Sequence, residues 1–123
     1  MAFIADYVLD AALSKLDTEA NRLDITSTEA TTYTEATSTY TLGNKTSLSV
    51  GSAADRSPNG RKVTVAAITD GSVTGTGTAA YWAIVDTGNS RLLATGALSA
   101  SQSVTSGNTF TLAAFDIGIP DAA

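Results

Sequence analysis

The feature that most constrains the fold is a series of short segments between residues 61 and 117 in which apolar and polar residues alternate. Successive side chains of a strand point to opposite faces, so a half-buried strand shows this alternation. Turn residues separate most of the segments, a spacing typical of all-β domains. We therefore predict a mainly β fold, an antiparallel β-sandwich or barrel with one or two short N-terminal helices. The predicted strands are residues 61–69, 72–78, 79–86, 91–98, 101–104 and 109–117.

Two of these segments differ most from the others in composition. Asp70 and Gly71 are predicted to form a two-residue hairpin turn, because this pair tolerates positive φ angles. The segment that follows, residues 72–78, has one large apolar residue and two glycines, which predicts an edge strand or a close approach between strands. Residues 79–86 are the most apolar run and predict a central strand covered on both faces.

The end of the series predicts turns and a change of direction. Residues 87–90 and 106–108 are rich in Gly, Asn and Ser and are predicted to be turns. The alternation changes phase at Ala113 and Ala114, because Phe115 continues it on the opposite parity. We interpret the two alanines as a bulge or bend that redirects the strand.

The N-terminal part predicts helix followed by strand. Residues 4–17 carry apolar side chains at helical spacing, which predicts a short amphipathic helix. An extended arm that pairs with another subunit is the alternative. Residues 22–27 then alternate as a strand. The apolar positions of the predicted helix are Ile4, Val8, Ala11, Ala12 and Leu16.

Residues 28–40 contain two similar stretches, and the second, from Thr34 to Tyr40, predicts a two-turn helix. Thr34 is placed to cap it, and Gly43 to end it in a left-handed conformation. Tyr33 and Tyr40 would lie on one side, either packed against the sheet or forming an interface or sugar-stacking pair. Residues 46–60 are predicted to be a long surface loop around a brief strand at 48–50.

Length predicts one domain for residues 1–123, made of three parts. Residues 1–20 are the helix or arm, 22–119 the β domain, and 120–123 a tail. Thr and Ser together supply 33 residues, 20 of them Thr, and only 15% of the chain is charged. Because threonine is β-branched and suits a half-exposed sheet, this composition fits an extracellular or particle-bound β domain better than a cytosolic enzyme.

The chain contains no His and no Cys, which removes the common catalytic triads, thiol chemistry and His-based zinc or iron sites. The remaining candidates for acid catalysis are Asp86, Asp116 and Asp121, and for a calcium site Asp55, Asn59 and Asp70. The catalytic candidates lie at strand ends or in the tail, where Asp commonly forms turns, and the calcium candidates lack EF-hand spacing. We predict no enzyme activity, no metal and no cofactor.

Charge and hydropathy restrict the partners. The net charge is −5 and the seven Lys and Arg residues are scattered, which excludes direct nucleic-acid binding as the expected role. No apolar run is long enough to span a membrane, and the first residues lack a basic secretion-signal segment. Arg61 and Arg91 open two predicted strands, where we expect them to pair with Asp70 or Asp86.

Three stretches carry a resemblance to known proteins: TEATSTYTLGNK, GRKVTVAAITDGSVTGTGTAAYWAIVD and RLLATGALSASQSVTSGNTFTLAAFDIGIPD. With these stretches the sequence resembles small structural proteins encoded in tailed bacteriophages and prophages, over nearly the whole chain. The resemblance implies a virion protein assembled in the host cytoplasm, either a head decoration (cement) protein or a tail or neck component. The resemblance identifies no functional residues in this sequence.

The resemblance implies binding to the major capsid protein or other virion proteins, and a homo-oligomer. Exposed strand edges and terminal arms are the means by which such subunits join neighbours. The candidate interface residues are Phe3, Ile4, Tyr33, Tyr40, Ile117 and Ile119. The alternative is a receptor- or carbohydrate-binding module of a tail or fibre, with Trp82 or the tyrosines stacking on the ligand. A buried Trp82 favours the structural role and an exposed one favours ligand binding.

Overall fold

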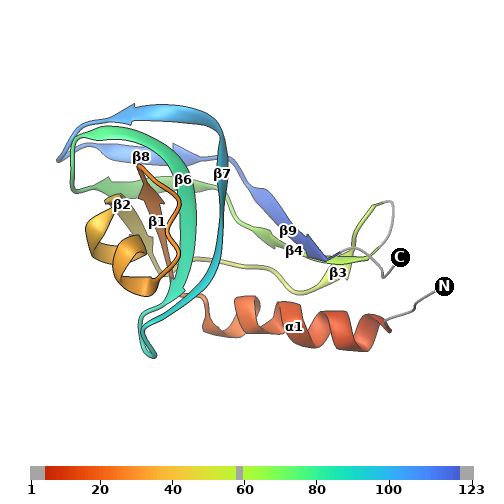
Figure 1. The fold of residues 1–123 in the computed structure, drawn as a ribbon. Helices are drawn as coiled ribbons and strands as arrows, with labels where there is room; N and C mark the ends of the chain where they lie inside the picture. Colours follow the sequence, from red (N-terminus) through yellow and green to blue (C-terminus); the bar gives the residue numbers. More distant parts are fainter. Residues whose placement is uncertain (1–4, 58–59, 120–123) are drawn as a thin grey trace.

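The computed structural model describes residues 5–57 and 60–119. The fold is mainly β, with 51% of residues in strands, and its six-stranded antiparallel sheet curls into a half-barrel beside one main helix (Figure 1). This confirms the predicted fold class. The elements are α1 (Asp6–Glu19), β1 (Arg22–Thr26), a short π-helix η1 (Glu35–Thr39), β2 (Thr41–Thr46), β3 (Ala54–Asp55), β4 (Arg61–Val65), β5 (Ile68–Val73), β6 (Gly77–Asp86), β7 (Arg91–Val104), β8 (Thr109–Leu112) and β9 (Phe115–Ile119).

Two sheets share the strands. The six-stranded sheet has the order β7-β6-β1-β2-β5-β8, and a three-stranded sheet has the order β3-β4-β9. The small sheet extends away from the half-barrel, and α1 runs beside it, so that α1 begins and β9 ends at the same end of the molecule (Figure 1). Among the described residues, no helix is long and apolar enough to cross a membrane.

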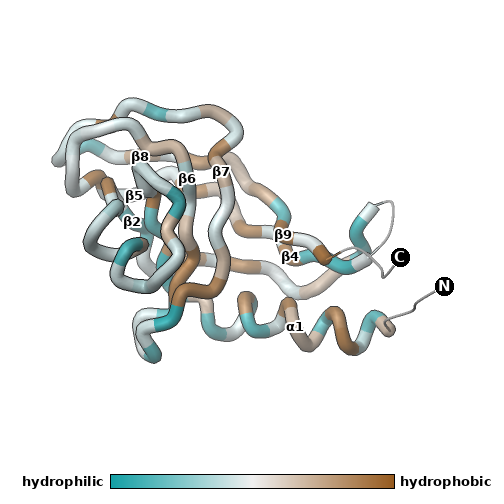
Figure 2. Tube along the Cα trace, viewed as in Figure 1, coloured by the Kyte–Doolittle hydropathy of each residue, from teal (hydrophilic) through white to brown (hydrophobic). Residues whose placement is uncertain are grey.

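The main core fills the inside of the curled sheet. Leu23 and Ile25 of β1 are 0% and 1% exposed, and Ile84 of the neighbouring strand β6 is 0% exposed. Apolar residues follow β6 and β7 and recur on the inner side of α1 (Figure 2). Ala83 and Val85 of β6 are also buried, but in a second cluster on the other face with Ala30 and Ala36. Both faces of β6 are therefore covered, as predicted.

Strands pass from one sheet to the other at two pairs of alanines. β8 ends before Ala113 and β9 begins after Ala114, and the chain moves there from the large sheet to the small one. This confirms the predicted bend. Ala66 and Ala67 make the corresponding break between β4 and β5. The turns predicted at 87–90 and 106–108 are also present, the second with Gly107 at a φ of 92°.

The hairpin predicted at Asp70 and Gly71 is wrong. Both residues lie inside β5, and β4 pairs with β9 rather than with β5. The physical reason is packing across the sheet: a Cβ at Gly71 would lie 2.3 Å from the Phe110 ring, so the glycine makes room for that ring. Residues 72–78 are accordingly not one strand, because they end β5, cross a connection and begin β6.

Helix α1 is present as predicted, but most of the apolar positions that predicted it are not on its buried face. Leu9, Leu13 and Leu16 are the buried residues, whereas Val8, Ala11 and Ala12 face solvent. Both sets have helical spacing, and leucine buries more apolar area than alanine, so the leucine face packs against the core. The predicted position Ile4 lies outside the described residues.

The second predicted helix is shorter and ends differently. It is the π-helix η1, and Thr34 is at its N-cap position as predicted, but the Thr34 side chain makes no capping hydrogen bond. The Glu35 N–H donates to Thr32 Oγ1 at 3.1 Å instead. Gly43 does not end it, because Gly43 is buried within β2, where a Cβ would lie 2.5 Å from the carbonyl oxygen of Ser72. In the predicted loop 46–60, only Val50 forms a bridge near the expected strand at 48–50, and β3 comes later.

Candidate functional site

A groove of about 450 Å³ lies between β7 and the junction of β8 and β9. Its walls are residues 96–99 of β7 and residues 112–116, and Trp82 of β6 forms the floor. The two walls come from opposite ends of the curled sheet, because β7 and β8 are its first and last strands. The groove is therefore the open seam of the half-barrel. We call it the seam groove.

Trp82 is held in the seam groove by contacts on its ring. It is paired in register with Gly96, where a Cβ would lie 2.6 Å from the indole Cζ2 atom, so the indole covers the glycine. The Phe115 ring lies 4.8 Å from the indole, centroid to centroid, at an angle of 40°. Trp82 is half-buried, packed against the main core on one side and exposed to the seam groove on the other.

Two irregular backbone segments frame the seam groove. Residues 98–101 of β7 oppose the single residue Ala80 of β6, so these four residues bulge out of the strand pair. Ala113 and Ala114 lie between β8 and β9 and belong to no strand. The side chain of Gln102 donates a hydrogen bond to the Thr111 carbonyl oxygen at 3.2 Å and ties the two walls together near one end.

A charged pair lies where the seam groove meets a second, polar hollow. Lys62 Nζ lies 3.0 Å from Oδ2 of Asp116, and the Thr64 hydroxyl donates to Oδ1 at 2.7 Å. The hydrogen bond from Thr64 and then that from Lys62 lower the pKa of Asp116. Asp116 also lines the second hollow, of about 390 Å³, together with Lys62 and Gly118. Asp116 is thus held as a carboxylate at the rim.

The lowered pKa of Asp116 gives an expected pH dependence. A carboxyl whose pKa is lower in the folded state stabilises the fold above its unfolded value of about 3.9, and this contribution is lost as pH falls through the folded value. We expect Asp116→Asn to be less stable than the wild type at pH 7 and equally stable at acid pH. Urea unfolding between pH 2 and pH 7 measures this, and a stability difference that stays constant over that range would contradict it.

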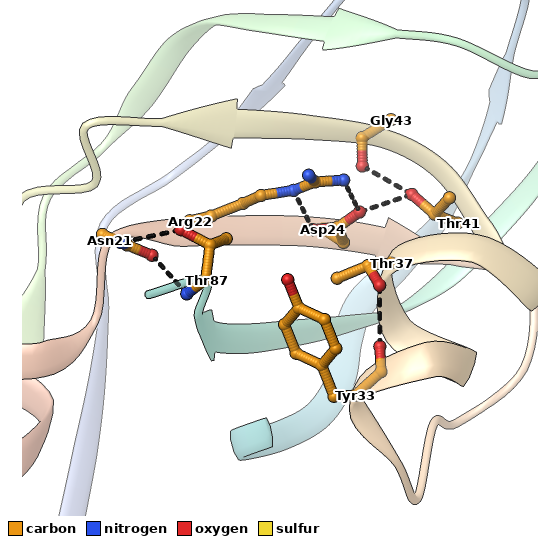
Figure 3. Close-up of polar contacts among 8 residues, drawn as sticks. All are labelled: Asn21, Arg22, Asp24, Tyr33, Thr37, Thr41, Gly43 and Thr87. Carbon is orange, nitrogen blue, oxygen red and sulfur yellow. Dashed lines mark hydrogen bonds and ion pairs between the residues drawn. The ribbon is translucent and has the colours of Figure 1, made fainter. Parts of the chain in front are cut away.

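A buried ion pair on β1 is the second polar cluster, and Figure 3 shows it between β1 and β2. Asp24 is 0% exposed. Arg22 binds it with two nitrogens, Nε to Oδ1 at 2.7 Å and Nη2 to Oδ2 at 2.9 Å. The Thr41 hydroxyl donates to Oδ2 at 2.6 Å. Because Thr41 opens β2, the carboxylate joins the two strands.

Burial raises the pKa of Asp24, against the opposing effect of the Arg22 and Thr41 hydrogen bonds. The hydrogen bond with Asp24 in turn raises the pKa of Arg22. Tyr33 lies below the pair with its hydroxyl directed toward it (Figure 3). The nearby Thr26 hydroxyl is buried without a hydrogen-bond partner among the described residues. The segment that covers this face, residues 27–40, therefore encloses polar groups that sequence alternation assigned to solvent.

The two described candidates for acid catalysis, Asp86 and Asp116, are held by different local partners. Asp86 accepts hydrogen bonds from the Gly88 backbone at 3.0 Å and the Asn89 side chain at 2.7 Å, and so stabilises the β6–β7 turn. The Asn89 hydrogen bond is the main cause of its lowered pKa. Asp116 binds Lys62 and Thr64 on the small sheet, and Asp121 lies outside the described residues. Each described candidate thus has a local structural partner.

The calcium candidates are also dispersed. Asp55 pairs with Arg61, Asp70 pairs with Lys45, and Asn59 lies outside the described residues. Within residues 5–57 and 60–119, no group of three or more acidic side chains is placed to hold a metal ion. Asp70 has a lowered pKa, chiefly because of the hydrogen bond from Lys45.

The predicted arginine pairs are partly wrong. Arg61 pairs with Asp10 of α1, Nε to Oδ1 at 2.7 Å, and with Asp55, rather than with Asp70. The reason is that Arg61 belongs to the small sheet, against which α1 packs. Arg91 forms an ion pair with Glu19, with Nη1 3.5 Å from Oε1. It also lies opposite the predicted partner Asp86 in the register of β6 and β7.

The predicted interface residues lie at separate places. Phe3 and Ile4 are outside the described residues. Tyr33 is half-buried against the outer cluster, and Tyr40 is half-buried after η1. Ile117 and Ile119 of β9 are partly buried against the main core, so the protein's own packing accounts for part of their apolar surface. A role for any of them in binding a second protein stays a prediction.

One exposed apolar surface was missed in the sequence. Tyr7 is 85% exposed and Val8 is 54% exposed on α1, outside the face that carries the buried leucines. The sequence did contain the signal for this surface, because residues 4–17 have apolar side chains on two sides of the predicted helix. Only one side of a helix can pack against the sheets of the same chain. We call Tyr7 and Val8 the outer helix pair.

No protein-family description matches the chain, and neither the curated proteins nor the solved structures include a significant match.

Proposed function

We propose that this chain is a non-enzymatic structural protein of a bacteriophage particle, a decoration or cement protein that attaches to the head lattice. The observation that carries the proposal is the outer helix pair, a Tyr and a Val largely exposed beside buried leucines on one helix. Large exposed apolar side chains that gather on one surface are typical of a protein contact. The partner is the major capsid protein or another virion protein, and repeated attachment implies a homo-oligomeric arrangement on the particle.

The charged side chains support a role in attachment rather than in catalysis. The described carboxylates that were candidates for catalysis are bound to Lys, Thr, Asn or backbone groups. The chain has no His or Cys to supply another base or nucleophile. With a net charge of −5, the surface is also unsuited to direct nucleic-acid binding. The resemblance of the sequence to virion proteins points the same way.

The alternative role, a carbohydrate-binding module of a tail or fibre, has weaker support. Trp82 is half-buried, so its exposure alone does not choose between the two roles. Stacking on a sugar requires an open aromatic face. The Trp82 indole covers Gly96 and contacts the Phe115 ring, so only the part of the ring that is open to the seam groove could contact a sugar.

The outer helix pair gives a direct test. Tyr7→Ser with Val8→Ser removes the two large exposed apolar side chains of α1, and burial of two such side chains is worth more than the ~1.4 kcal/mol that equals tenfold in affinity. We expect at least about tenfold fewer copies on particles purified by density gradient and quantified by mass spectrometry. The free energy of unfolding should change by less than about 0.5 kcal/mol, because the sites are exposed.

Asp17→Asn on the same helix is the matched control and should leave the copy number unchanged. Full occupancy by the double variant would show that this helix face is not the contact. Absence of the wild-type chain from purified particles would overturn the proposed function itself.

A further inference from the structure

We propose that the seam groove receives an extended segment of a neighbouring protein, which adds as a strand along β7 and places one large apolar side chain over Trp82. The inference deepens the proposed attachment role and rests on it for the identity of the neighbour as a virion protein. Two features of the structure support the inference. They are the outer edge of β7, the end strand of its sheet, and the apolar floor of the seam groove.

The outer edge of β7 favours an extended segment as the partner. β7 is the end of its sheet, so its outer edge is not paired with another strand of that sheet, and residues 98–101 also have no register partner in β6, which passes them with the single residue Ala80. Ala113 and Ala114 form the facing wall and make no backbone hydrogen bond with another described residue. Unpaired N–H and C=O groups on a strand edge are satisfied best by another extended chain, whose own groups repeat at the same spacing. A helix presents no free backbone groups of this kind.

The floor calls for an apolar side chain. Trp82, Leu98, Leu112 and Phe115 line the seam groove and are each partly buried, so each leaves apolar area uncovered. In an added strand, every second side chain points to the same face, so one such residue can lie over Trp82 while its neighbours point outward. The hydrogen bond from Gln102 to the Thr111 carbonyl oxygen joins the two walls and closes one end of the seam groove to the bound segment. At the other end the segment would pass the ion pair of Lys62 and Asp116, which suits a polar residue there.

The experiment uses the full chain and Trp82 as its probe. Trp82 is the only tryptophan, so its emission reports on the seam groove without labelling. Random decapeptides displayed on yeast are selected against the purified protein, and enriched sequences are synthesised and titrated while Trp82 emission is recorded. We expect enriched peptides to alternate polar and apolar residues around one Leu, Ile or Phe, and to change Trp82 emission saturably.

Two matched comparisons decide between strand addition and simple apolar contact. Methylation of alternate backbone nitrogens in the same peptide keeps its side chains but removes its hydrogen bonds, and should weaken binding at least about tenfold. Ala114→Tyr fills the seam groove from an exposed wall position and should abolish the emission change. Ala11→Tyr, at an exposed position of α1 that does not line the seam groove, should leave it intact.

Equal binding by the methylated peptide, or by the Ala114→Tyr protein, would overturn the inference. So would selection that enriches no peptide over the Ala114→Tyr protein. A change in Trp82 emission with protein concentration alone, together with dimers in sedimentation, would show that a second copy is the occupant and would also overturn it. Since these measurements use no particle, they are independent of the outer helix pair: failure here leaves the proposed attachment standing, and failure there leaves peptide binding intact.

Discussion

Asp24→Ala is expected to lower the free energy of unfolding by about 3 kcal/mol, the cost typical of removing one partner from a buried ion pair. The carboxylate is fully buried and accepts hydrogen bonds from Arg22 and Thr41, so its loss removes the acceptor of Arg22 and leaves the Thr41 hydroxyl with the Gly43 carbonyl oxygen at 3.1 Å. Urea or guanidinium unfolding of the purified variant measures the change. The value lies at the lower end of the range for buried pairs because the Arg22 side chain is 23% exposed and keeps some hydration.

The paired variant Arg22→Met with Asp24→Val is the matched control. It removes both charges and introduces apolar side chains at both positions, so it should be more stable than Asp24→Ala alone. If the double variant is as unstable as the single one, the loss comes from packing on β1 and not from the unpaired charge.

Leu13→Ala is expected to cost about 3 kcal/mol, because Leu13 is 2% exposed in the main core and its truncation leaves a cavity. Val8→Ala, outside the buried face of α1, should change the free energy of unfolding by less than about 0.5 kcal/mol. Chemical unfolding of the two variants under one set of conditions makes the comparison.

The pair of variants tests which face of α1 packs on the sheet. The described structure buries Leu9, Leu13 and Leu16 and exposes Val8. A larger loss for Val8→Ala than for Leu13→Ala would mean that the helix is rotated relative to this arrangement.

Local alternation was enough to predict most strands, because each strand's pattern depends on its own residues. The break at Ala113 and Ala114 was visible for the same reason, as a change in the phase of alternation. Which strands pair is not local. The pairing of β4 with β9 joins Val63 to Ile117, and the misplaced turn at Gly71 followed from assuming that sequential strands pair.

The candidate site was predicted less well, because it depends on distant segments. Trp82 was identified from its strand, but the seam groove exists only where the two ends of the curled sheet approach each other. Asp24 alternates with Leu23 and Ile25 and so reads as a solvent-facing residue. It is buried because residues 27–40 fold over that face, and no periodicity within β1 carries that information.

Image reconstruction of intact particles that contain this chain tests most directly the proposal that the half-barrel attaches to a protein lattice through α1. We expect repeated density on the head that fits the six-stranded half-barrel, with Tyr7 and Val8 against a neighbouring protein. Particles without such density, or density that fits the half-barrel but leaves α1 facing solvent, would contradict it.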